Sequence, residues 1–578
     1  MNTRRFAISV SVAFGVAALV SGIGQSRAQT GSKEAGVVTT TKGRWTTDPD
    51  GWITSDDRAA AAIRAAALRA EAANRYSQSK AASAVVGLPK PATATLTTNA
   101  IPDYFGTCPN YANSPLPTLN ANGTITGGIK KFVDTLPGLG VAGTNDLGQY
   151  ISVAVADTNA YPGADYYEIA LVRYAEKMHT NLPATELQGY VQLETTANSN
   201  VSKHVALTYP DGSAILKLNG SQAYAVDNSQ YLGPVMVAQR NRPVRVKFTN
   251  FLPTGTNGTL FLPVDTTIMG AGMGPSNMVE NYTQNRATLH LHGGLTPWIS
   301  DGTPHQWTAP AGETTSYPKG VSVRYVPDMW FDSLGNRVPA GTAGASNNPG
   351  PGSLTFYYTN QQSQRLMFYH DHAYGITRLD VYAGEAAAYI LRDPVELALM
   401  NGGSIGTTNV TANTIPTNEI PLVIQEKIYV DTNNLVAEDP TWAWGTTPGT
   451  PHGGDLWFPH VYMPNQNPID PMGMNAVGRW DYNTWMYPPQ TGQIIGPVPN
   501  PLANPAINEP PQNPGTPLPT ITPETFCDTP IVNGTAYPTL KVQPTAYRFR
   551  ILNAANDRTL NLQLYYADPV GATVIRGG

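Results

Sequence analysis

The 578-residue sequence predicts an all-β fold, and two observations carry that prediction. Glycine (54 residues) and proline (50 residues) are frequent, which is typical of short elements joined by many turns. Short runs rich in Val, Thr, Tyr and Phe also alternate apolar and polar positions, as half-buried strands do. In residues 243–252, Val244, Val246 and Phe248 share one face for this reason.

The strand-like runs form two groups, so we expect two β units, residues 127–395 and residues 415–578. A stretch rich in Pro, Asn and Trp, residues 438–525, is predicted to be a long loop insertion in the second unit. The most regular strand candidates are residues 243–252, 287–293, 353–360, 365–373, 420–430, 546–554 and 560–566.

The N-terminus is predicted to be a signal peptide, residues 1–28. Arg4 and Arg5 form a positive start, residues 6–20 are apolar, and residues 26–28 offer a small-residue cleavage site. The protein is therefore expected to be exported to the periplasm or secreted. The two arginines partly fit a twin-arginine signal, with an ordinary signal peptide as the alternative.

An N-terminal extension, residues 29–126, separates this signal from the first β unit. It reads as irregular chain except for an alanine-rich helix at residues 55–76, since alanine has the highest helix propensity. The helix has almost no apolar face, so we expect it to be peripheral.

Charge and cysteine content exclude some classes of function. Charged residues make up 13%, the formal net charge is −5, and no long basic run suggests nucleic-acid binding. No apolar segment is long enough for a stable membrane span. The two cysteines, Cys108 and Cys527, lack neighbouring metal ligands and are expected to be structural.

Four of the nine histidines occur in two H-x-H pairs, His290 with His292 and His370 with His372. Random placement would give roughly 0.1 such pairs. Residues two apart on a strand share a face, so both imidazoles of each pair would point the same way. Asp371, between His370 and His372, would point to the opposite face. There it would either support the ligands or lie in solvent. Two neighbouring strands could then gather four imidazoles around copper or zinc; hydrogen-bonded surface histidines are the alternative.

The motifs "TLHLHGG" and "YHDHA" resemble the first two copper-ligand motifs of the multicopper oxidases. The similarity is greatest to the branch of spore-coat laccases and bilirubin oxidases, and it covers about residues 130–566. Further matching segments are residues 131–137, 179–190, 233–253, 262–267, 300–307, 375–394 and 532–554.

The resemblance implies cupredoxin-like Greek-key β-sandwich domains, three in the family. Here the second would be incomplete and the third absent. It also implies that His290 binds the type 2 copper and that His292, His370 and His372 bind the type 3 copper pair. Asp301 matches the family's acid beside the copper cluster, which orients bound water and delivers protons; a turn aspartate before glycine is the alternative.

The family's later motifs are not in this sequence. The H-C-H cysteine is the thiolate of the type 1 copper, where substrate electrons enter, and neither cysteine here has flanking histidines. We therefore expect the N-terminal portion of a copper oxidoreductase that couples oxidation of a small reducing substrate to reduction of O2. It would need a missing C-terminal region to complete the site. A non-enzymatic exported copper binder is the alternative, and a zinc hydrolase is a weaker one.

Overall fold

The computed structural model describes a few short segments before residue 128 and most of the chain after it. The described residues are 6–11, 114–115, 118–119, 125–126, 128–262, 264, 270–272, 274, 281–432, 452–456, 498–499, 512–513, 527, 529–556 and 559–566. The predicted helix at residues 55–76 and Cys108 lie outside these residues, as does most of the predicted insertion at residues 438–525.

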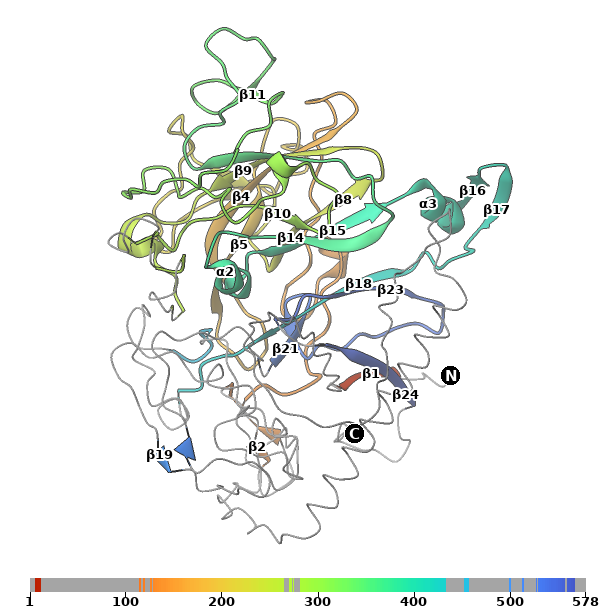
Figure 1. Ribbon diagram of the computed structural model, residues 1–578. Helices are drawn as coiled ribbons and strands as arrows, with labels where there is room; N and C mark the ends of the chain where they lie inside the picture. Colours follow the sequence, from red (N-terminus) through yellow and green to blue (C-terminus); the bar gives the residue numbers. More distant parts are fainter. Residues whose placement is uncertain are drawn as a thin grey trace, which may run out of the picture.

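Two four-stranded sheets form the first unit (Figure 1). One sheet has the order β13-β9-β4-β5, in which β9 runs parallel to β4 and the other pairs are antiparallel. Its strands are β4 (Asp165–Glu176), β5 (Thr185–Gln192), β9 (Val244–Asn250) and β13 (Ser353–Tyr358).

The other sheet has the order β10-β14-β15-β8, and its β15–β8 pair is parallel. Its strands are β8 (Leu232–Gln239), β10 (His290–His292), β14 (Arg365–His370) and β15 (Ala386–Arg392).

The two sheets share one apolar core and so form a β-sandwich. Val246 and Phe248 of β9 and Phe356 of β13 meet Tyr369 of β14 and Leu291 of β10 in one cluster, and each of these side chains is at most 1% exposed. Alternation along the strands supplies this face, because every second side chain points inward. The all-β prediction is confirmed.

A third four-stranded sheet, of order β22-β21-β18-β23, belongs to the second group of strands. Asn533, in the turn before β22, joins this sheet to the first unit by donating its side-chain amide to the carbonyl of Pro137 at 2.9 Å. Its strands are β18 (Glu419–Lys427), β21 (Thr529–Val532), β22 (Thr535–Ala536) and β23 (Arg548–Asn553).

Two α-helices flank β15, namely α2 (Thr377–Ala383) and α3 (Pro394–Asn401). Asp393 caps α3 by accepting a hydrogen bond from the Glu396 backbone N–H at 2.8 Å, and proline occupies the first turn. Within the part of the chain that the structure describes, neither these nor any other helix has the length and apolar character needed to cross a membrane.

The remaining elements are short strand pairs and single 3-10 turns. Phe6–Ser11 (β1) lies inside the predicted signal peptide and pairs with β24. The signal peptide and the domain limits stay predictions. The elements are β1 (Phe6–Ser11) with β24 (Asn561–Tyr566), β2 (Thr118–Leu119) with β3 (Ile125–Thr126), β6 (Val205–Ala206) with β7 (Tyr224–Ala225), β11 (Trp330–Phe331) with β12 (Arg337–Val338), β16 (Gly402–Ile405) with β17 (Thr408–Ala412), β19 (Val498–Pro499) with β20 (Gln512–Asn513), and η1 (Val141–Gly143), η2 (Gly255–Gly258) and η3 (Trp298–Ser300).

Candidate metal centre

The first H-x-H pair forms the short strand β10, which lies at the edge of its sheet. Leu289 and Leu291 point into the sandwich core and are 0% and 1% exposed. His290 and His292 therefore share the opposite face, where His290 is half-buried and His292 is exposed. The expected alternation is confirmed for this pair.

The second pair is only half on a strand. β14 ends at His370, so the prediction that His372 lies on the same strand is wrong. His370 still faces the same way as His290, because the two residues are directly opposed in the antiparallel ladder. His372 reaches the site from the turn that follows.

The four imidazoles lie close together. The ring of His290 is 5.3 Å from that of His370 and 4.8 Å from that of His372, measured between ring centroids. The His292 ring is 5.3 Å from that of His370. His290, His292 and His370 each offer a ring nitrogen, and these three nitrogens lie within 4.8 Å of one another. The ring nitrogens of His372 lie outside this group of three, although its ring is near that of His290.

Hydrogen bonds fix which ring nitrogens face the centre. The Nδ1 of His290 lies against the carbonyl of Asp301, and the Nδ1 of His370 lies against the carbonyl of Asp371. A carbonyl only accepts, so both Nδ1 atoms carry the proton and both Nε2 atoms are left as acceptors, that of His370 for the Nδ1–H of His292. The Nε2 of His370 is 3.1 Å from the Nδ1 of His292.

The surroundings favour the uncharged form of His370 and His292. Burial, together with the neighbouring histidines, lowers the pKa of His370 to about 3, although a backbone hydrogen bond acts in the opposite direction. Burial and then His372 lower the pKa of His292. Neutral imidazole is the form that binds a metal, so the lowered pKa values of His370 and His292 favour metal binding by these two residues.

Asp301 reaches the centre mainly through its backbone. Its carbonyl contacts His290, whereas its carboxylate Oδ2 is 3.8 Å from the Nδ1 of that ring and the side chain is 41% exposed. Its Oδ1 accepts a hydrogen bond from the Thr296 hydroxyl at 3.0 Å. Gly302 permits the approach, because a Cβ there would lie 2.3 Å from the carbonyl oxygen of Leu289.

Asp371 is fully buried, so the solvated alternative considered for it is wrong. Its carboxylate accepts backbone hydrogen bonds from Thr288 at 2.8 Å and from Ala373 at 2.7 Å. It also belongs to a group of three buried acids, with Asp380 and Glu385, whose oxygens lie within 4.8 Å of one another. Sequence reasoning missed this group, because the three acids meet through α2 and the turn to β15 rather than through a short motif.

The chain is similar in sequence to several curated copper oxidases. No protein-family model matches the chain. The laccase of Bacillus subtilis (strain 168) is 26% identical over 438 residues, which are 75% of this chain and 52% of that protein. A multicopper oxidase of Oryza sativa subsp. japonica is 25% identical over 57% of this chain and 36% of that protein.

The chain is related to the multicopper oxidases. It spans about half the length of the curated laccases of this family that it matches first. Among solved structures, the multicopper oxidase of Aquifex aeolicus is similar at 15% identity and a TM-score of 0.31, over 74% of this chain and 47% of that one.

The histidine cluster fits the copper that multicopper oxidases contain. The Nδ1 of His372 is buried and has no hydrogen-bond partner, which is costly for a polar atom unless a ligand takes it up. The donor set consists of imidazole nitrogens, which suit Cu(II) and Zn(II) better than Mg(II) or Ca(II).

Proposed function

We propose that His290, His292, His370 and His372 bind copper as one half of a trinuclear oxidase centre. His290 would hold the type 2 ion, and the other three histidines would hold the type 3 pair. The observation that carries the proposal is the meeting of four imidazoles where β10 pairs with the end of β14, with neighbouring ring centroids 4.8 to 5.8 Å apart.

The supporting groups orient two of these ligands. Carbonyls of Asp301 and Asp371 hold the Nδ1–H of His290 and His370, so that each Nε2 points away from its carbonyl partner. Such outer partners set the tautomer and orientation of a ligating histidine. Strand pairing between β10 and β14 adds a rigid base for both residues.

Asp301 is proposed to supply protons to the centre. Its carboxylate is 41% exposed and lies 3.8 Å from the imidazole of His290, so it can take a proton from water and hold it beside the cluster. Bound copper would supply one-electron redox chemistry, which reduces O2 to water with four electrons and four protons.

The proposed activity of the whole protein is a laccase-like oxidation of a small reducing substrate, such as a phenol, a pigment or a metal ion. None of the 578 residues forms an H-C-H motif, so the type 1 site and the other cluster ligands would come from residues beyond this sequence. An exported copper-binding protein without oxidase activity is the second candidate, because the four histidines by themselves would serve it. The signal peptide predicted at residues 1–28 favours export in both cases.

The test is copper uptake by the full chain. We expect stoichiometric binding of Cu²⁺ to the purified protein, measured by metal analysis after removal of free metal. Replacing His290 and His372 together by alanine should abolish that binding. A double replacement of His204 and His452 is the matched control, since both are exposed histidines that lie outside the cluster. Unchanged uptake in the first variant would place the ligands elsewhere.

A further inference from the structure

We infer that Asp371 is a positioning residue that sets the spacing between the two H-x-H segments. The inference rests on the proposed copper function and deepens it. Asp371 is 0% exposed and does not itself point to the imidazole cluster as a ligand. Its carboxylate instead joins the backbone of both segments.

One oxygen of this carboxylate serves each segment. Oδ1 accepts the N–H of Thr288 at 2.8 Å, and Thr288 lies two residues before His290. Oδ2 accepts the N–H of Ala373 at 2.7 Å, and Ala373 directly follows His372. The side chain thus connects the start of the first ligand segment to the end of the second.

The connection matters because the strand ladder stops there. The pairing of β10 with β14 ends at the pair His290 and His370. His372 lies beyond it and has no ladder partner to fix its position. The carboxylate of Asp371 continues the link between the two segments past the end of the sheet. The backbone N–H of Asp371 adds a 3.3 Å hydrogen bond to the carbonyl of Glu385, which ties the same turn to β15.

Only a carboxylate fits this role. Each of its two oxygens faces an N–H donor, so the site needs two acceptors. Asparagine has one acceptor and one donor group, and its NH2 would face a backbone N–H. Partners of this kind around metal ligands typically contribute about 10–100-fold to metal affinity.

The experiment compares Asp371→Asn with Glu385→Gln in the full chain. Both substitutions replace a fully buried acid of the same cluster by its amide. Glu385 contacts the side chain of Gln188 at 2.6 Å, an acceptor role that glutamine keeps, and its side chain joins neither ligand segment. Cu²⁺ alone is the probe, and the readouts are its dissociation constant and the electron paramagnetic resonance spectrum of the bound ion.

We expect Asp371→Asn to weaken Cu²⁺ binding about 10–100-fold and to change the copper spectrum. Glu385→Gln should leave both as in the wild type. Equal affinity and an identical spectrum in Asp371→Asn would overturn the inference. Loss of copper binding in the wild type, or binding that does not depend on His290 and His372, would instead overturn the proposed function.

Hydrogen exchange in the metal-free wild type keeps the inference testable if Asp371→Asn does not fold. We expect the amides of Thr288 and Ala373 to be protected, because both donate to the buried carboxylate. Exchange of these two amides at the rate of exposed turn residues would contradict the inference.

Discussion

The first unit and the third sheet bury their strands in different ways. In the first unit, β9 and β13 place Phe248 and Phe356 in a core that a second sheet covers, and both are 0% exposed. In the third sheet, β23 alternates half-buried and exposed positions, and Phe549 and Ile551 are 37% and 49% exposed. The histidine cluster is built on the unit whose core is covered on both sides.

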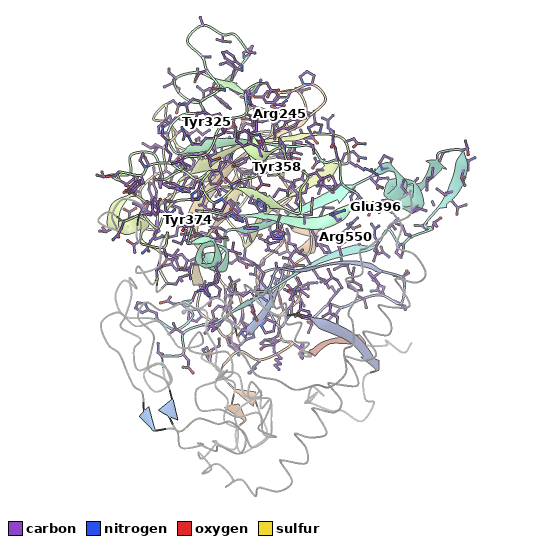
Figure 2. All side chains as sticks on the ribbon, in the orientation of Figure 1. Arg245, Tyr325, Tyr358, Tyr374, Glu396 and Arg550 are labelled. Carbon is purple, nitrogen blue, oxygen red and sulfur yellow. The ribbon has the colours of Figure 1, made fainter. Side chains whose placement is uncertain are left out.

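The partly exposed edge strand β23 takes part in a network of ion pairs. Arg548 and Arg550 of β23 bind the two carboxylates Glu396 of α3 and Glu419 of β18, and Arg392 of β15 joins them. Figure 2 shows Glu396 and Arg550 near each other. The glutamate side chains are 2% and 6% exposed. Apolar burial between two sheets therefore stabilises the first unit, whereas β23 is attached by its ladder with β18 and by a network of buried carboxylates and arginines.

The largest expected effect is in the covered core. Phe356→Ala should lower the free energy of unfolding by about 3–5 kcal/mol, because it leaves a cavity between two sheets that cannot collapse fully. Denaturant unfolding of wild type and variant checks this. A loss below about 1 kcal/mol would show that the sandwich is not the main source of stability.

The next effect is in the charge network. Glu396→Gln should lower the free energy of unfolding by about 2–3 kcal/mol, because the guanidinium groups of Arg548 and Arg550 lose one buried carboxylate partner. Arg548 is 20% exposed, so water reduces the penalty below that of a fully buried pair. The same unfolding measurement applies, and a neutral result would mean that Glu419 alone suffices.

A third effect depends on pH and comes from Lys427 of β18. Burial lowers the pKa of Lys427 from 10.5 to about 7, and the ammonium group lies over the rings of Tyr231 and Tyr382 at 5.0 and 4.9 Å. Between these two pKa values the unfolded chain binds a proton that the folded chain does not. The free energy of unfolding should therefore rise with pH by about 1.4 kcal/mol per unit above pH 7.

Lys427→Met removes this titration. The difference in unfolding free energy between wild type and variant should shift in favour of the wild type from pH 7 to pH 9. Measurements at pH 7, 8 and 9 check the slope, and other titrating groups cancel in the comparison. A constant difference would show that Lys427 keeps its ordinary pKa.

The smallest effect is on the exposed face of β23. Phe549→Ala is the same substitution as Phe356→Ala, made in β23 instead of the covered core. It should change the free energy of unfolding by less than about 1 kcal/mol, since the ring of Phe549 is already partly in water. A loss as large as that of Phe356→Ala would mean that this face is covered in solution.

Short-range alternation made much of the fold predictable. Val246 and Phe248, or Leu289 and Leu291, mark a buried face because side chains two apart on a strand point the same way. His290, His292 and His370 follow from the same rule. His372 does not, because the rule cannot tell that β14 ends two residues earlier. The contacts of Asp371 with Thr288 join segments 83 residues apart, and no local pattern encodes them.

Imidazoles from β10 and from the end of β14 are proposed to share one metal centre. Pulsed electron paramagnetic resonance of the Cu²⁺-loaded full chain tests it most directly, because it detects nitrogen nuclei of coordinated imidazoles. We predict couplings from imidazoles of both pairs, which diminish when His290 is replaced by alanine and also when His370 is. A spectrum that neither replacement alters would contradict the account.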